Sequence, residues 1–282
     1  MASRQRVEQH LKASADDTDR VVAALLAGDA AAAAKIAQLS SNATAYGMAL
    51  GSCARDASAA CGLLSAARWA QLDAGNAAPW LLMASAALQC GDEAGLAEGL
   101  HRASLATTMD VGFGRMAGRV VAALPQIAAD PAWPVAAVNA NVLVAVIGQE
   151  AAVAIPSYSA VNRGCSAAAL RDSNRQQLCR ATARMMVKHG RTLLDIGIGL
   201  GLAKRTGIPD TELPVTSAEL DAGMKWMAEV QPGPPEQAFS CEAFARLPKY
   251  FASVAQRGEW GAVQDVMRAS QAAASAAAVT KP

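Results

Sequence analysis

The sequence predicts an all-α protein built from antiparallel helix hairpins, and three observations lead to that prediction. First, 52% of the 282 residues are hydrophobic but only 4% are aromatic, so the apolar content is mostly alanine. Alanine is the best helix former and adds little side-chain volume. Second, the alternation of apolar and polar residues that is typical of strands is almost absent. Third, short breaks that contain glycine and an acidic residue separate the apolar segments.

Apolar residues at helical spacing predict a succession of helices with short connections. We expect a helical-repeat half over 1–130, a C-terminal helical half over 131–275 that continues it, and a flexible tail over 276–282. The segment QPGPPE at 231–236 cannot continue a helix and is the clearest linker. The expected helices span residues 4–14, 17–27, 29–41, 43–53, 61–74, 77–90, 92–107, 111–129, 134–154, 173–189, 191–206, 216–230, 236–256 and 259–275.

The same turn recurs between expected helices, at Gly28-Asp29, Gly91-Asp92 and Gly258-Glu259. Glycine readily adopts the left-handed conformation that ends a helix. The acid that follows is favourable at the positive N-terminus of the next helix. Each of these turns therefore predicts a helix–turn–helix hairpin.

Charge and hydropathy exclude some functions. The formal net charge is +1, which gives no electrostatic case for binding nucleic acid or an anionic membrane. The stretch between Pro134 and Pro156 is long enough to span a bilayer. However, it contains polar residues that are costly in hydrocarbon, so we expect a buried central helix instead. These residues are Asn139, Asn141, Gln149 and Glu150.

Residues 72–104, LDAGNAAPWLLMASAALQCGDEAGLAEGLHRAS, resemble a tetratricopeptide repeat. Trp80 matches the first aromatic position, Gly91 the turn glycine and Ala103 the late small residue. Ala74 replaces the usual proline, and Leu100 replaces the second-helix aromatic. The alanine-rich style also resembles that of uncharacterised bacterial helical proteins.

The resemblance implies a tetratricopeptide-like (TPR-like) α-solenoid whose concave face binds a protein or peptide. The first helices of the hairpins line that face in such stacks, so Ser85 and Gln89 on 77–90 are the expected contact positions. The expected function is therefore a non-catalytic protein- or peptide-binding module without cofactor, whose partner and oligomeric state the sequence does not specify. An accessory or inhibitor protein of a secreted enzyme is an alternative.

Residues 193–201, LLDIGIGLG, resemble the first motif of the S-adenosylmethionine-dependent methyltransferases. In that family a glycine turn follows a strand, and the matching residues here are Asp195, Gly197, Gly199 and Gly201. The flanking residues do not fit, because a helical segment precedes the motif and no second strand follows it. We expect a helix whose glycines let a neighbouring helix pack closely, and methyltransferase activity is the alternative.

Six cysteines are present, without the spacing of a zinc or redox motif. Cys53 and Cys61 bracket a short loop, and Cys165 and Cys179 bracket the start of a helix, so each pair could form a disulfide across a helix–helix turn. If these pairs are oxidised, a periplasmic or secreted location is favoured. The N-terminus MASRQRVEQHLKASADD has no apolar export signal. It therefore indicates either the cytoplasm or numbering that starts at a mature end.

The histidines, His10, His101 and His189, lie far apart, and none has a metal-ligand neighbour at helical spacing. We therefore expect no metal site. No hydrolase or phosphate-binding motif marks a catalytic residue.

Overall fold

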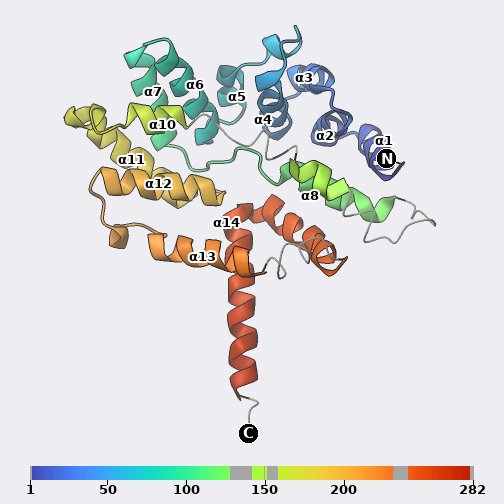
Figure 1. The fold of residues 1–282 in the computed structure, drawn as a ribbon. Helices are drawn as coiled ribbons and strands as arrows, with labels where there is room; N and C mark the ends of the chain where they lie inside the picture. Colours follow the sequence, from blue (N-terminus) through green and yellow to red (C-terminus); the bar gives the residue numbers. More distant parts are fainter. Residues whose placement is uncertain (1, 128–141, 149, 151–157, 231–240, 280–282) are drawn as a thin grey trace.

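The computed structural model describes residues 2–127, 142–148, 150, 158–230 and 241–279, and these residues form an all-α fold (Figure 1). Two isolated bridges, Asn76 to Thr108 and Met109 to Gly190, are the only β-type pairings among the described residues. The all-α prediction is confirmed.

The first part of the chain forms short helices, and all but the last of them pack against one another in sequence order. They are α1 (Ala2–Lys12), α2 (Asp17–Ala27), α3 (Ala30–Leu39), α4 (Ala43–Ser52), α5 (Ala66–Leu72), α6 (Ala77–Gln89), α7 (Glu93–Ser104) and α8 (Arg115–Ala123). Short 3₁₀ turns occur at Cys53–Arg55, Cys61–Leu63 and Leu124–Gln126.

The second part adds one short helix, followed by longer helices that lie below the first part (Figure 1). They are α10 (Ser159–Gly164), α11 (Ser173–His189), α12 (Leu193–Arg205), α13 (Ser217–Val230) and α14 (Cys241–Val279), with 3₁₀ turns at Ala169–Arg171 and Asp210–Glu212. Residues 142–148 are also helical. The remainder of the expected helix 134–154 lies outside the described residues, as does the linker at 231–236.

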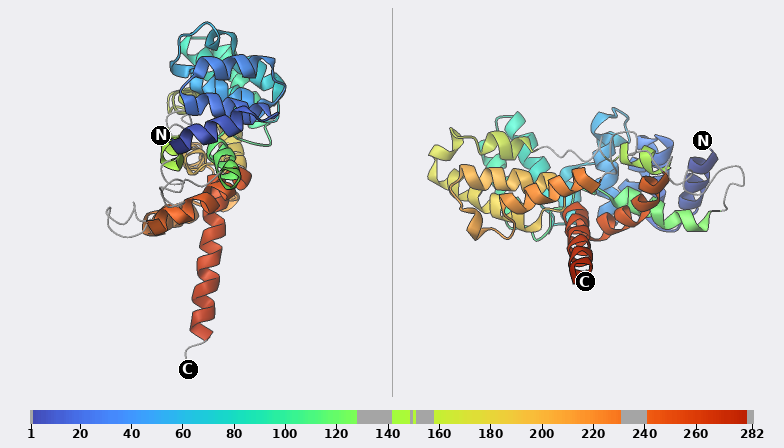
Figure 2. Two further views of the ribbon diagram at one scale, coloured as in Figure 1. Left: turned by 90° about the vertical axis from the view of Figure 1, so that its right-hand side faces the viewer. Right: turned by 60° about the horizontal axis from the view of Figure 1, so that its bottom comes forward.

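Sequential packing is interrupted at α8, which lies against α14 and α1 instead of against its chain neighbour α7. Helix α11 takes the place beside α7, and α12 and α13 then follow in order. The last part of α14 points away from the rest of the molecule (Figures 1 and 2).

Two expected helices begin later than the sequence pattern indicated. Helix α5 starts at Ala66, because Leu64 is extended and the Ser65 hydroxyl caps the helix by accepting the Arg68 N–H at 3.2 Å. Helix α8 starts at Arg115, because Gly112 and Gly114 have positive φ angles that no helix accommodates. The short helix α10 was not expected at all.

The glycine of each glycine–acid turn has a positive φ angle, 78° at Gly28, 71° at Gly91 and 79° at Gly258, although the ψ angle of 168° at Gly258 is not that of a left-handed helix. Asp29 and Asp92 cap the helices that follow them. Gly258 divides α14 into two helical parts, which agree with the two expected helices. The Glu259 carboxylate behaves differently, because it accepts the Leu193 N–H of another helix at 2.9 Å.

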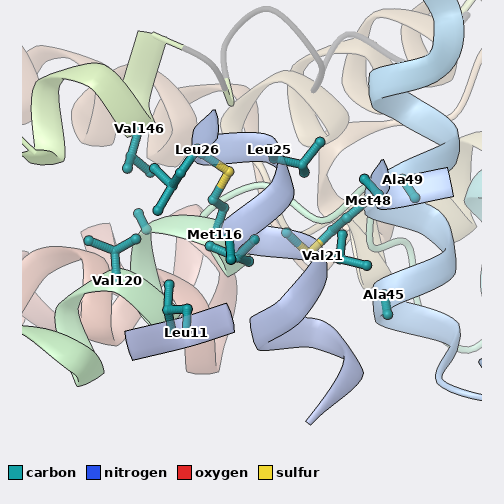
Figure 3. Close-up of a cluster of buried hydrophobic side chains, with 14 of the residues drawn as sticks. Leu11, Val21, Leu25, Leu26, Ala45, Met48, Ala49, Met116, Val120 and Val146 are labelled. Carbon is teal, nitrogen blue, oxygen red and sulfur yellow. The ribbon is translucent and has the colours of Figure 1, made fainter. Parts of the chain in front are cut away.

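The buried side chains form two clusters. One combines α1 to α5 with Ala78 of α6, with α8, with residues 142–146 and with Phe251, Val254 and Ala262 of α14. In it Leu11 of α1, Leu26 of α2, Met116 and Val120 of α8, and Val146 point toward one another (Figure 3). The other cluster combines α6 and α7 with α10 to α13 and with Trp260 and Val263 of α14. The second cluster supports the candidate site.

Glu150 joins a distant segment to the first cluster. Its Oε1 atom accepts the N–H groups of Met116 at 2.7 Å and Ala117 at 3.1 Å, so it caps α8, whose own N-cap residue is Gly114. Burial raises the pKa of Glu150 to about 7, although these backbone hydrogen bonds oppose the rise. In the described part of the chain, no helix is both long and apolar enough to cross a bilayer.

Both cysteine pairs expected from the spacing are bonded. Cys53–Cys61 has a Cα–Cα distance of 5.3 Å, and Cys165–Cys179 one of 5.9 Å. The second bridge ties the end of α10 to α11, and both of its cysteines are fully buried. Cys90 is exposed and unbonded.

The glycines of LLDIGIGLG lie in α12, and one of them permits close packing. A Cβ atom on Gly199 would lie 2.8 Å from Met186 Cβ and 3.0 Å from the Val187 N atom of α11. A Cβ atom on Gly201 would meet nothing within 4 Å. The expectation of a packed helix is therefore confirmed, and Gly199 is the glycine that its contact with α11 requires.

The two glycines give a matched prediction. Gly199→Ala should lower the free energy of unfolding by about 1–3 kcal/mol, because the added methyl overpacks the α11–α12 contact. Gly201→Ala should raise it by about 0.5–1 kcal/mol, because alanine favours the helix and meets no obstacle. Urea denaturation of both variants measures the difference. Equal shifts of the same sign would contradict the α11–α12 packing.

The second bridge gives another prediction. The double variant Cys165→Ala/Cys179→Ala should lower the free energy of unfolding by about 3 kcal/mol, since a closed loop of this length restricts the unfolded chain. Cys90→Ala is the control and should change stability little. Denaturation of the oxidised proteins compares them, and an unchanged midpoint for the double variant would show that this bridge is dispensable.

Candidate functional site

The candidate site is a groove of about 540 Å³ between α7, α10 and α11, which we call the α7–α11 groove. Its apolar surface is aliphatic, and charged or amide side chains share its lining. The apolar residues are Leu88, Leu96, Ala97, Ala168, Ala169 and Leu178, and the polar ones are Glu93, Arg163, Asp172, Asn174 and Arg175. This volume is in the range of known ligand pockets.

Small residues bring the walls of the groove together. A Cβ atom on Gly99 would lie 2.7 Å from Ala84 Cβ and 2.9 Å from the Ala84 backbone, so α6 and α7 pack closely only because Gly99 has no side chain. A Cβ atom on Gly164 would lie 3.2 Å from Leu96 Cδ1 at the floor of the groove. The Cys165–Cys179 bridge then holds the end of α10 against α11.

Arg175 connects the three helices that form the groove. Its Nη2 atom donates to Glu93 Oε2 of α7 at 2.8 Å, and its Nη1 atom donates to the Gly164 carbonyl of α10 at 3.3 Å. Only 14% of the Arg175 side chain is exposed, whereas 74% of the Glu93 side chain is exposed. Asp172 caps α11 by accepting the Arg175 backbone N–H at 2.7 Å.

Two hydrogen bonds position α10, the shortest wall. The Tyr158 hydroxyl donates to Asp195 Oδ1 of α12 at 2.5 Å, and the Ala160 N–H donates to the Ser85 hydroxyl of α6 at 3.2 Å. Asp195 Oδ2 also accepts the backbone N–H groups of Arg191 and Thr192. These bonds fix α10 between α6 and α12.

The pKa shifts are consistent with this arrangement. Burial raises the pKa of Asp195, and the hydrogen bonds from Tyr158 and the 191–192 backbone oppose that rise. Burial, and then the charge of Asp195, raise the pKa of Tyr158. The Tyr158 hydroxyl therefore keeps its proton and remains a hydrogen-bond donor.

The structure separates the two expected contact positions on α6. Gln89 is exposed, but it does not line the α7–α11 groove. The expectation that Ser85 is exposed is wrong, because only 2% of it is accessible and its hydroxyl supports α10. Trp80 is half-buried; its indole N–H donates to the Ala74 carbonyl at 3.2 Å, and the Arg102 guanidinium lies 5.9 Å from its ring.

Asp195, Gly197, Gly199 and Gly201 do not form the turn that the methyltransferase resemblance implies. All four lie in α12, where Asp195 completes a capping box with Thr192. The helix α11 precedes them, and the described residues contain no strand that could deliver such a turn. The Asp195 carboxylate is buried and fully engaged within the protein.

Sequence reasoning missed Arg163, Arg175 and Tyr158. Helix α10 has six residues, too few to show a helical period. The available signal was the Cys165–Cys179 pairing, which brings Arg163 and Arg175 near the same turn. In the part of the chain that the structure describes, no group of three or more His, Cys, Asp or Glu side chains is placed to hold a metal ion.

No protein-family model, no curated protein and no solved structure matches this chain. The chemistry of the α7–α11 groove therefore rests on its own residues, which offer aliphatic surface, two guanidinium groups, two carboxylates and an amide.

The support of α10 gives a prediction. Tyr158→Phe should lower the free energy of unfolding by about 1.5–3 kcal/mol, the usual effect of losing a hydrogen bond to a charged group. It should also speed hydrogen exchange at α10 amides. The exposed Asn162→Ala on the same helix is the control. If the two variants have similar free energies of unfolding and similar exchange rates at α10 amides, the Tyr158–Asp195 hydrogen bond does not position α10.

Proposed function

We propose that the protein is a non-catalytic binding module that holds a peptide, or an extended segment of another protein, in the α7–α11 groove. The observation that carries the proposal is the groove itself, with a half-buried aliphatic floor and charged side chains around it. Protein interfaces commonly combine an apolar centre with a polar rim. The groove is also built on helices that a disulfide and buried hydrogen bonds hold in place, which favours binding because little order must be gained.

The architecture supports the same proposal. The α6–α7 and α11–α12 hairpins lie next to each other through the α7–α11 contact, and the first of them carries the tetratricopeptide-like residues. We infer that these hairpins are two units of a TPR-like stack. Stacked hairpins typically bind polypeptides along one face.

The disulfides favour one setting for this function. Bridges such as Cys53–Cys61 and Cys165–Cys179 persist in oxidising compartments and are rare in the cytosol. We therefore propose a periplasmic or secreted location. An accessory or inhibitor protein of a secreted enzyme is the second candidate, because such a protein would bind a segment of its enzyme in that compartment.

Selection from a displayed library of random heptapeptides tests the proposed function. Selected peptides should bind the oxidised protein with micromolar dissociation constants, measured by fluorescence anisotropy. Ala168→Trp should weaken binding at least tenfold, because its bulk fills the groove at an exposed lining position. Ala86→Trp, at an exposed position on α6 outside the lining, is the matched control. Peptides that are insensitive to Ala168→Trp would contradict binding in the groove.

A further inference from the structure

The charged side chains of the α7–α11 groove differ in how firmly their contacts hold them in place. Arg175 is held on its inner side by the Gly164 carbonyl, and Asp172 is committed to capping α11. Glu93 reaches Arg175 from an otherwise solvated position, with 74% of its side chain exposed. Ion pairs with an exposed partner contribute little to stability, so another carboxylate can replace Glu93 on Arg175 at small net cost.

A guanidinium that is largely buried must keep a partner of opposite charge. When Glu93 swings into solvent, the Nη2 atom of Arg175 requires another carboxylate at the same place. Arginine binds carboxylates with strong, directional hydrogen bonds. Glu93 thus occupies the position that the carboxylate of a ligand would take.

Arg163 adds a second positive charge to the same lining. Its side chain is exposed, and no ion pair joins it to any residue within the described ranges. With Glu93 displaced, the groove contains two guanidinium groups and only the Asp172 carboxylate. The vacated groove is therefore complementary to an anion.

The aliphatic floor of the groove sets a second requirement that a ligand must meet. Leu88, Ala97 and Leu178 are half-buried and supply aliphatic surface beside Arg175. A ligand that only presents a carboxylate would leave this surface exposed to water. A ligand that also presents an aliphatic side chain would bury it, and apolar burial favours binding.

We propose that the α7–α11 groove selects a peptide segment in which an Asp or Glu residue, or the terminal carboxylate, lies next to an aliphatic residue. The carboxylate replaces Glu93 on Arg175 and is attracted by Arg163, while the aliphatic side chain packs on Leu88, Ala97 and Leu178. This inference rests on the proposed function, since it specifies the ligand of the same groove.

The test uses a selected heptapeptide in two synthetic forms, one with its carboxylates and one with each replaced by the corresponding amide. Wild type should bind the carboxylate form about tenfold more tightly, as expected for a charge-assisted hydrogen bond. Arg163→Gln should reduce that preference several-fold. Arg171→Gln should leave it unchanged, because Arg171 is also exposed, on the nearby 3₁₀ turn, but does not line the groove.

Glu93 provides a more specific readout. Glu93→Gln should tighten binding of the carboxylate form several-fold, because it removes the internal competitor for Arg175. Glu98→Gln on the same helix is the control, since Glu98 pairs with Arg102 and does not line the groove. If Glu93→Gln and Glu98→Gln change the affinity for the carboxylate form equally, the loss of any negative charge on α7 explains the change. That result would refute the replacement of Glu93 by the carboxylate of the ligand.

The outcomes separate this inference from the proposed function. One outcome is that Ala168→Trp weakens peptide binding but the carboxylate and amide forms bind equally well. This outcome would overturn the proposed selection of a carboxylate and would leave peptide binding in the groove intact. A library that yields no peptide sensitive to Ala168→Trp would overturn both.

Discussion

The buried carboxylate of Asp195 is the constraint on which the second half of the molecule depends. It lies at the start of α12, is fully inaccessible to water, and accepts hydrogen bonds from the Tyr158 hydroxyl and from the N–H groups of Arg191 and Thr192. A charge removed from water is tolerated only when such donors compensate for its lost hydration. The 190–195 turn, the start of α12 and the residue preceding α10 are therefore fixed relative to one another.

The same turn also ties the two parts of the chain together. The Met109 N–H donates to the His189 carbonyl at 3.1 Å, and Arg191 pairs with Asp110 at 3.4 Å, which attaches the segment after α7. On the other side, the Trp260 N–H donates to the Arg191 carbonyl at 3.1 Å. The close approach of α14 requires Gly258, since a Cβ atom there would lie 2.7 Å from the Arg191 oxygen. Residues 109–110, Tyr158 and residues 258–260 thus all contact residues 189–195.

Local signals in the sequence predicted the helices, the glycine–acid turns and the cysteine pairs, because each depends on residues close together in the chain. The alanine-rich segments show their own period, and Gly28, Gly91 and Gly258 mark turns without reference to the rest of the fold. The site was not predictable in this way. Arg175 functions through contacts with Glu93 and Gly164, and the Ser85 hydroxyl accepts a hydrogen bond from Ala160 of α10, which is 75 residues later. LLDIGIGLG resembles a cofactor-binding motif only over its own nine residues. The surrounding sequence forms helices, and the segment is helical as well.

The two disulfides join cysteines that are consecutive in the sequence, at separations of 8 and 14 residues. Short loops close readily in an unfolded chain, because little entropy opposes the meeting of their ends. Six cysteines can pair in many ways, but nearest-neighbour pairing selects these two as soon as each segment is free to be oxidised. Each bridge therefore closes within its own stretch of the sequence and does not require the rest of the fold. Both bridges can form before the groove exists. The second bridge then brings α10 and α11, two of the helices that form the groove, together.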